Sequence, residues 1–386
     1  MSSTTALTGA RIFDGETWHQ GQTLLLQDGK VAALVADTAI PSGTETLDAT
    51  DKLIVPGFID LQVNGGGGVM MNDVQNVETI ATICAAHARF GTTALLPTLI
   101  TDRPDITAAT IEAGLAAKAA GTPGFLGLHL EGPHLSLARK GAHDPALIRP
   151  MEETDLDRLL AAVSSFDVFM TTVAPENVSV EQVRALAEAG VLVSIGHTDS
   201  TCATVIRYAE AGARAVTHLF NAMSQLGNRE PGVVGAALSE GSLSAGLIAD
   251  GFHVDPVTMQ VALAAKTGPG HIFLVTDAMS TIGTDMTGFT LNGREIRREN
   301  GKLTLSDGTL AGADIDMLAS IRFLHDRIGL PLEEALRMAS LYPARAARVE
   351  GRKGSIAVGM DADLVVMTPE LEMVSTWIGG ICRYQA

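Results

Sequence analysis

Gly127-Leu128-His129-Leu130-Glu131-Gly132-Pro133-His134 places a carboxylate at the end of a short apolar run, directly before turn-forming residues. Three more segments have this layout, namely Ser194-Ile195-Gly196-His197-Thr198, Thr217-His218-Leu219-Phe220-Asn221-Ala222-Met223 and Leu274-Val275-Thr276-Asp277-Ala278. Each run is typical of a buried strand, and its polar residue sits where the strand stops. In a (β/α)8 barrel those strand ends meet on one face, which carries the active site. The four segments therefore predict a barrel with a polar site at its mouth.

The middle of the chain alternates between strand and helix patterns, as expected for an α/β fold. Helical periodicity is clear over Val77–Phe90 and Val180–Ala189, for example. The first strand is not followed by a GxGxxG motif, which argues against a dinucleotide-binding sheet. Eight strands with helices between most of them favour a closed barrel. The predicted strands are Ile54–Gln62, Thr92–Leu99, Phe125–Leu130, Val168–Val173, Val191–Ile195, Ala215–Leu219, Ser244–Ala249 and Ile272–Thr276.

The two ends of the chain differ from the middle. Short alternating strands fill residues 6–54, with Asp28-Gly29 as a hairpin turn, and similar strands recur after residue 352. We therefore predict an α/β protein: a (β/α)8 TIM barrel over residues 55–351, with a small β-sandwich domain built from residues 1–54 and 352–386. A polar segment near 284–309 interrupts the barrel pattern, and its turn signals predict a β-hairpin insertion.

Composition limits the partners. The chain has 386 residues, 46% of them apolar and 18% charged, enough for one barrel and a smaller domain. Its formal net charge of -17 argues against nucleic acid and anionic membranes, so an anionic substrate would need locally placed cations. We find no signal peptide and no membrane span, and the three cysteines are odd in number and far apart. We expect a cytoplasmic protein.

Three of the strand-end residues form a candidate metal site. Glu131, His197 and His218 offer one oxygen and two imidazole nitrogens, a set that suits zinc and leaves a fourth position for water. One such histidine alone is more often a hydrogen-bonded core residue. The coincidence of four strand-end placements favours a site. His129 has the opposite orientation to Leu128 and Leu130, which predicts a buried residue that supports the ligands.

Two further residues fit catalytic roles. Asp277 ends the last strand, where a carboxylate beside a metal can act as general base and later protonate a leaving amine. Its alternative is a helix N-cap, but Met279–Gly283 is a poor helix start. His143 lies in a loop after the Glu131 strand and could stabilise an oxyanion; a solvated loop histidine is the alternative.

Two residues fit substrate binding. His253 follows the seventh strand and could bind a substrate hydroxyl. Arg229 lies in a glycine-flanked loop and could bind a phosphate in bidentate fashion. A surface arginine paired with Glu230 or another acid is the more ordinary alternative.

Four motifs resemble those of the N-acetylglucosamine-6-phosphate deacetylases of the amidohydrolase superfamily: residues 128–133, 217–223, 229–232 and 249–255. The resemblance implies a homodimer that releases acetate from a phosphorylated amino sugar, as in amino-sugar catabolism and cell-wall sugar recycling. It implies these roles: metal ligands Glu131, His197 and His218; catalytic aspartate Asp277; carbonyl-assisting His143; phosphate contacts Asn221 and Ala222, joined by Arg229 from the partner subunit; and sugar-hydroxyl contact His253.

One departure affects the expected metal content. Many amidohydrolases carry His-x-His at the end of the first strand, whereas this chain has Gln62-Val63-Asn64. Amide side chains are poor zinc ligands, so we expect one divalent metal per subunit: Zn²⁺, with Fe²⁺, Co²⁺ or Mn²⁺ as alternatives. We include Gln62 among the expected substrate contacts.

The resulting hypothesis is hydrolysis of the acetamide of N-acetylglucosamine 6-phosphate. The first rival is a related amidohydrolase acting on another N-acyl amino sugar, an N-acyl amino acid or a cyclic amide. The rival outside enzymes is a barrel used only for assembly. The joint presence of Glu131, His197, His218 and Asp277 argues against that rival, because an assembly role would not need a hydrolytic set.

Overall fold

Eight parallel strands form the predicted barrel in the computed structural model, which describes residues 4–386. Their spatial order follows the sequence, so each strand pairs with the next one along the chain. The barrel closes between the last strand and the first, where the Asp277 amide donates to the Gln62 carbonyl at 3.0 Å and Val63 bridges Ala278 in parallel. The strands are β8 Phe58–Val63, β11 Thr92–Ile100, β12 Gly127–Glu131, β13 Val168–Val173, β14 Leu192–Ile195, β15 Ala215–Val216, β16 Ser244–Leu247 and β17 Ile272–Leu274.

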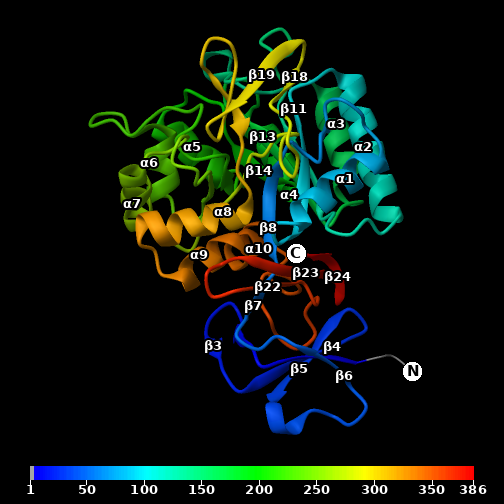
Figure 1. Cartoon of the computed structure of the whole chain (residues 1–386). Helices are drawn as coiled ribbons and strands as arrows, with labels where there is room; N and C mark the ends of the chain where they lie inside the picture. The colour runs from blue at the N-terminus through cyan, green and yellow to red at the C-terminus, as the bar shows by residue number, and fades with distance from the viewer. Residues whose placement is uncertain (1–3) are drawn as a thin grey trace.

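Helices surround this barrel and cover its strands (Figure 1). Several begin at side-chain caps: Asn76 accepts from the Thr79 amide and Thr201 from the Thr204 amide, which satisfies otherwise unpaired first-turn N–H groups. The helices are α1 Val77–Ala88, α2 Pro104–Ala119, α3 Glu153–Val163, α4 Val180–Glu188, α5 Cys202–Glu210, α6 Gly232–Ser239, α7 Pro256–Ala265, α8 Met317–Arg322, α9 Leu332–Ala339 and α10 Leu341–Ala346, with the π-helix η3 Phe323–Ile328 and the 3-10 turns η1 Asp37–Ala39 and η2 Leu137–Arg139.

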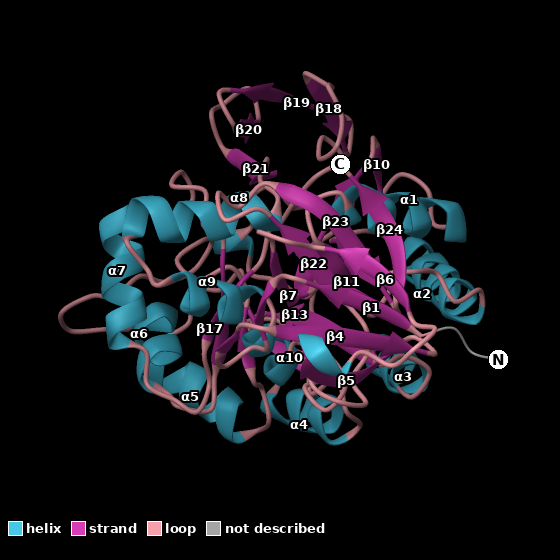
Figure 2. Ribbon diagram, turned by 60° about the horizontal axis from the view of Figure 1, so that its bottom comes forward, coloured by secondary structure: helices cyan, strands magenta, loops and turns pink. Residues whose placement is uncertain are grey.

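The two ends of the chain form two further sheets below the barrel in Figure 1. One has the order β5-β4-β1-β6 and the other β24-β23-β22-β7-β2-β3. The strands are β1 Thr5–Thr8, β2 Arg11–Phe13, β3 Trp18–His19, β4 Gln22–Gln27, β5 Lys30–Ala36, β6 Glu45–Asp48, β7 Leu53–Pro56, β22 Leu364–Met367, β23 Met373–Ile378 and β24 Ile381–Gln385. Viewed from below, these sheets lie in front of the barrel and its ring of helices (Figure 2). A shared core that includes Ile12, Leu24, Ile54 and Leu364 joins them.

The insertion near residues 284–309 contains more strands than the expected hairpin. Four antiparallel strands form it: β18 Gly288–Leu291, β19 Arg294–Glu299, β20 Lys302–Thr304 and β21 Leu310–Ala313. Asn292 and Asn300 take positive φ at its two tight turns. The sheet lies at the end of the barrel away from the terminal sheets, and the Arg294 guanidinium donates to the Ala142 carbonyl, next to His143 (Figure 1). Its core includes Met70, of the short hairpin β9 Gly65–Gly66 and β10 Val69–Met70.

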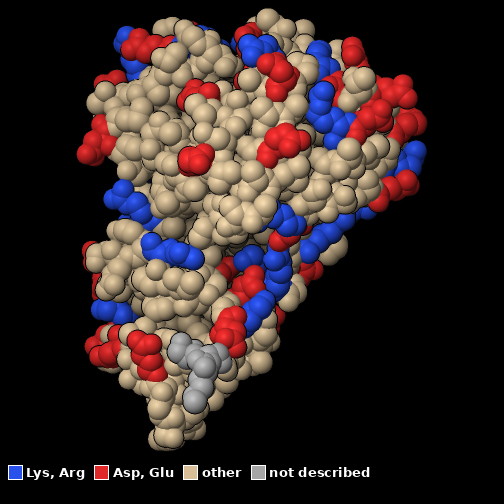
Figure 3. Space-filling model, turned by 90° about the vertical axis from the view of Figure 1, so that its right-hand side faces the viewer, with Lys and Arg blue, Asp and Glu red and all other residues tan. Residues whose placement is uncertain are grey.

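Charged side chains do not form a single-sign surface on the face in Figure 3, where acidic and basic groups alternate with wide uncharged areas. The basic groups that line up diagonally across the lower half of that face have acidic groups among them, so the band is mixed in sign, unlike the basic stripe typical of nucleic-acid binding. Within residues 4–386, every helix is too short or too polar to cross a lipid bilayer.

Candidate metal-dependent active site

A cavity of about 380 Å³ opens at the carboxyl ends of the barrel strands, within the size range of small-molecule sites. Loops after the barrel strands and residues of the insertion line it together. Most residues expected at the site line this cavity: Glu131, His143, His197, His218, Asn221, Ala222, His253 and Asp277.

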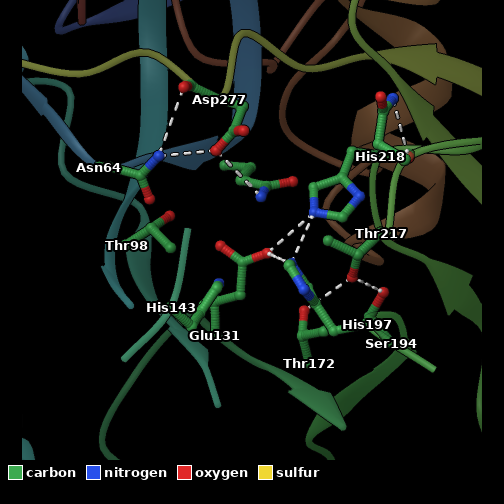
Figure 4. A network of polar contacts seen from close by, with 12 residues as sticks. Asn64, Thr98, Glu131, His143, Thr172, Ser194, His197, Thr217, His218 and Asp277 are labelled. Carbon is green, nitrogen blue, oxygen red and sulfur yellow. Dashed lines mark hydrogen bonds and ion pairs between the residues drawn. The ribbon is translucent and has the colours of Figure 1, made fainter. Parts of the chain in front are cut away.

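Three of these side chains converge on one point (Figure 4). His197 Nε2 and His218 Nε2 each lie 3.1 Å from Glu131 Oε1 and 3.0 Å from each other. In a tetrahedral site with bonds of about 2.0–2.1 Å, ligand atoms would be roughly 3.3 Å apart, so this triangle has the dimensions of a metal site. His143 also approaches: one donor atom each from Glu131, His143 and His197 lie within 4.8 Å of one another. The set with His218 is the tighter of the two.

A hydrogen bond orients His197, whereas His218 Nδ1 is buried without a partner among the described residues. His197 Nδ1 lies 2.8 Å from the Arg139 carbonyl, which can only accept, so Nδ1 carries the proton and Nε2 presents a lone pair. The backbone takes positive φ at His197 (47°), His218 (27°) and Asp277 (52°). This conformation is unfavourable for residues other than glycine, so the surrounding structure must hold these residues in place.

The charge balance of the triangle suits a cation. Burial by itself would raise the Glu131 pKa, but the close approach of the His197 and His218 rings outweighs it and holds that pKa well below its usual range. Glu131 is therefore an anion in a buried place, facing two imidazole nitrogens. A divalent metal matches these donors in type, number and spacing, which meets the requirement that a buried charge be paired.

Asp277 has one oxygen held and one oxygen free. Asn64 Nδ2 donates to Oδ1 at 2.6 Å and Gln62 Nε2 donates to the same atom at 3.2 Å. Both of these hydrogen bonds go to Oδ1, and Oδ2 accepts none from residues 4–386. Burial, together with the negative charge of Glu131, raises the Asp277 pKa to about 6. This carboxyl can therefore exchange a proton near neutral pH.

His143 is arranged as a neutral hydrogen-bond donor. The Thr101 amide donates to His143 Nδ1 at 3.3 Å, and Thr101 Oγ1 lies 2.8 Å from the same nitrogen. Since Nδ1 accepts, the ring proton resides on Nε2. Burial lowers the His143 pKa to about 3, with a further contribution from His197, whose ring centroid lies 4.4 Å away. The solvated-loop alternative is wrong, because His143 is only 4% exposed.

Two other expected residues differ in their surroundings. His253 lines the cavity, and its Nδ1 donates to Asp250 Oδ2 at 2.6 Å, so Nε2 is the free nitrogen. Arg229 is exposed and does not line the cavity of its own chain. It has no hydrogen bond or ion pair with any described residue. Glu230 Oε1 instead accepts from the Cys202 and Gly232 amides, and Arg229 and Glu230 form no ion pair among the described residues.

Gln62 lies behind Asp277 and does not line the cavity. Three supporting residues escaped prediction: Asp60, which accepts from the Thr276 hydroxyl at 2.5 Å; Thr101, beneath His143; and Arg139, beside His197. One sequence signal could have found the first. Asp60, Gln62 and Asn64 are spaced two residues apart, the spacing at which side chains of a strand share a face.

Comparison with known proteins agrees with this geometry. Residues 53–382 match the amidohydrolase family, and the chain belongs to that family. It is 42% identical, over 87% of its own length and 84% of the relative's, to an N-acetylgalactosamine-6-phosphate deacetylase from Shewanella sp. (strain ANA-3). It is 34% identical to an N-acetylglucosamine-6-phosphate deacetylase from Haemophilus influenzae, with 91% of each chain covered.

Among solved structures, N-acetylglucosamine-6-phosphate deacetylase from Pasteurella multocida is similar over 99% of this chain and 100% of that one, with a TM-score of 0.95 and 32% identity. The predicted fold and the predicted family are thus both confirmed.

Proposed function

We propose that this protein hydrolyses the acetamide of N-acetylglucosamine 6-phosphate, releasing acetate and glucosamine 6-phosphate. One observation carries the proposal: a buried metal-type triangle of Glu131, His197 and His218 shares a cavity with an acid–base carboxyl, Asp277, and a neutral donor, His143. Metal-assisted amide hydrolysis uses a metal, a proton-transferring group and a donor to the oxyanion together. The relatives named above support the amino-sugar phosphate as substrate.

The metal we propose is a single Zn²⁺ held by Glu131, His197 and His218, where it would supply a Lewis acid and lower the pKa of a water. Asp277 Oδ2 takes the proton of the attacking water and passes it to the departing amine nitrogen. His143 Nε2–H donates to the carbonyl oxygen as that oxygen gains negative charge. We propose that Gln62 acts on Asp277 rather than on substrate, since it donates to Oδ1.

Binding of the substrate phosphate requires positive charge in the cavity, and a single chain places little there. Arg139 is the one arginine or lysine among the described residues that line the cavity, and it is ion-paired with Asp199 at 2.7 Å. We propose that Arg229 of a partner subunit reaches this cavity in a homodimer, where the backbone at Asn221 and Ala222 also contacts the phosphate. The loop carrying Arg229 projects from the barrel at the upper left of Figure 1.

An apolar hollow beside this loop supports the dimer. Its exposed members include Leu226, Val257 and Val261, at 56%, 65% and 56% exposure. Apolar side chains this exposed and adjacent to one another are typical of an interface. We also propose a reducing, cytoplasmic location, because Cys84, Cys202 and Cys382 are all unpaired.

A second candidate substrate is N-acetylgalactosamine 6-phosphate, since the Shewanella relative at 42% identity carries that activity in its name. The two sugars differ only in the configuration at C4. Selection between the two sugars therefore depends on contacts to the C4 hydroxyl. We propose His253 Nε2 as that contact, because His253 lines the cavity and its other ring nitrogen is already bonded to Asp250.

The test is acetate release by purified protein on both 6-phosphorylated epimers and on their unphosphorylated forms. We expect kcat/KM to be highest for N-acetylglucosamine 6-phosphate and to fall sharply without the phosphate. Higher kcat/KM on the galactose epimer would favour the second candidate. Absence of acetate release from every sugar by zinc-loaded protein would reject both.

A separate experiment tests Arg229. Arg229→Ala and Asp277→Asn chains, each weakly active alone, are co-expressed with different tags and the heterodimer is purified. One of its two sites has an intact Asp277 and receives an intact Arg229 from the other chain, so activity should return in part. Proven heterodimers without recovery would place Arg229 outside the partner's site.

A further inference from the structure

A chain of buried hydrogen bonds runs through the barrel beneath the metal-type triangle. His129 Nε2 lies 2.7 Å from Thr172 Oγ1, Thr172 Oγ1 lies 2.7 Å from Thr217 Oγ1, and Ser194 Oγ lies 2.6 Å from Thr217 Oγ1. At its other end His129 Nδ1 lies 3.4 Å from Thr98 Oγ1. Figure 4 shows Thr172, Thr217 and Ser194 joined beside His197. We call these five side chains the interior chain.

The interior chain links five consecutive barrel strands or their ends. Thr98 is on β11, His129 on β12, Thr172 on β13 and Ser194 on β14, while Thr217 directly follows β15. Three of these strands end at a candidate metal ligand or two residues before one. His129 lies two residues before Glu131 and shares its inward face, Ser194 lies three residues before His197, and Thr217 immediately precedes His218.

The protons available along the interior chain can form all of its hydrogen bonds in only one direction of donation. Thr98 Oγ1 donates to the Leu96 carbonyl and accepts from the Val63 amide, so it can only accept from His129 Nδ1. His129 Nε2 then accepts from Thr172, Thr172 from Thr217, and Thr217 from Ser194. In the opposite direction the Ser194 proton would have no acceptor among the described residues. Every member is 0–2% exposed, so water cannot replace a lost partner.

This linkage resists sliding of one strand past its neighbour. Sliding would break short hydrogen bonds in a dry interior, where an unpaired polar group costs about 1–3 kcal/mol. The positive φ of His197 and His218 is an unfavourable backbone state that needs such external support. The ligand atoms converge within 3.0–3.1 Å of one another, so a small axial shift of one strand would open the triangle.

We propose that the interior chain is a positioning device for the metal ligands, a proposal that rests on the metal site described under Proposed function. Its residues do not touch substrate or metal. They act through strand register, so that Glu131, His197 and His218 are preset for a metal ion before it arrives. Loss of the Thr172 hydroxyl should therefore speed metal release, and by more than a control mutation that destabilises the fold to the same extent.

Thr172→Val tests the proposal, because valine keeps the shape and removes the hydroxyl that joins His129 to Thr217. Thr171→Val is the matched control: Thr171 is the adjacent residue on β13, is 1% exposed, and donates one buried hydrogen bond to the Leu130 carbonyl at 3.1 Å, outside the interior chain. Thr172→Ser restores the hydroxyl. Zn²⁺-loaded proteins are mixed with a coloured chelator to measure the rate of metal release, and the Tm of each metal-free protein is recorded.

We expect Thr172→Val to release Zn²⁺ about tenfold faster, the lower end of the effect of residues that orient metal ligands. Thr172→Ser and Thr171→Val should release it near the wild-type rate, while both valine variants lower the metal-free Tm to a similar extent. An unchanged rate in Thr172→Val, or an equal acceleration in Thr171→Val, would overturn the proposal.

Ser194→Ala provides a second, milder variant should Thr172→Val not fold. It removes only the end of the interior chain and should still speed release measurably; an unchanged rate would overturn the proposal as well. The failure of the metal site itself is distinguishable. Wild-type protein that retains no Zn²⁺ would reject the proposed function, whereas tight wild-type retention with unaffected variants would reject only the positioning role.

Discussion

Replacing Asn64 with alanine should raise the pH at which activity is lost on the acid side. Asn64 Nδ2 donates to Asp277 Oδ1 at 2.6 Å and so favours the ionised carboxylate. The Asp277 pKa is about 6, because burial and then the Glu131 charge raise it. A general base must be ionised, so activity falls as the pH drops through that pKa. A bound divalent cation favours the carboxylate, which places the wild-type acid limb at or below about pH 6.

The size of the shift follows from the hydrogen bond that is lost. A bond to a charged group contributes about 1.5–3 kcal/mol, and one pKa unit is about 1.4 kcal/mol, so complete loss would raise the pKa by roughly one to two units. Gln62 still donates to the same oxygen at 3.2 Å, so we expect the lower value, about one unit. The sign is upward because the mutation removes a donor that favours the charged form.

The assay is kcat/KM for acetate release as a function of pH in the variant and the wild type. Asn72→Ala is the control, because Asn72 Nδ2 donates to another carboxylate, Asp102 Oδ2, at 2.8 Å. That variant should keep the wild-type acid limb. An Asn64→Ala enzyme that remains active with an unmoved acid limb would refute the reasoning, since Asp277 could not then be the group whose ionisation sets the limb.

Other changes probe the remaining parts of the site. Asp277→Asn should cost on the order of 10²–10⁴ in kcat, as loss of a general base does, with metal content preserved by elemental analysis; near-normal turnover would assign the proton transfer elsewhere. Arg229→Ala should weaken binding of the phosphorylated sugar by about 1.5–3 kcal/mol and barely change the activity on the unphosphorylated sugar, which a comparison of the two KM values checks. Thr101→Val should lower kcat, because His143 Nδ1 loses a hydroxyl partner; an unchanged kcat would show that the Thr101 amide alone orients the ring. Since the amides of Gln62 and Asn64 are engaged with Asp277, metal analysis should find about one ion per chain, and two tightly bound ions needed for activity would contradict this.

The barrel could be predicted from the sequence because the pattern that indicates each strand lies within a few consecutive residues. Each barrel strand is a short apolar run, and each candidate ligand lies where such a run ends, so Glu131, His197 and His218 could be predicted to meet without knowing any distance. The insertion was harder. Two Asn-Gly turns marked it as β structure, but the fourth strand, Leu310–Ala313, follows a third turn at Asp307-Gly308 and lies beyond residue 309, where the predicted insertion ended.

The supporting contacts of the site could not be predicted from the sequence because they join positions far apart along the chain. Asn64 and Asp277 are separated by 213 residues, and their hydrogen bond exists only once the last strand closes against the first. The interior chain has the same character. A threonine within an apolar strand resembles any β-branched core residue until its neighbours on the adjacent strands are known.

The pairing of β7 with β22 determines when the protein can complete its fold during synthesis. Leu53–Pro56 lies directly before the first barrel strand, yet its antiparallel partner, Leu364–Met367, is made only after the whole barrel has been translated. Until then one edge of β7 is an open strand edge, the kind of surface on which nascent chains associate wrongly. A ribosome that stops between residues 351 and 364 would thus release a chain with the barrel sequence present and this edge unprotected. Folding is completed only when the C-terminal strands have been synthesised and pair with β7. Truncation of these strands should therefore reduce the yield of folded protein, although they lie at the opposite end of the barrel from the site.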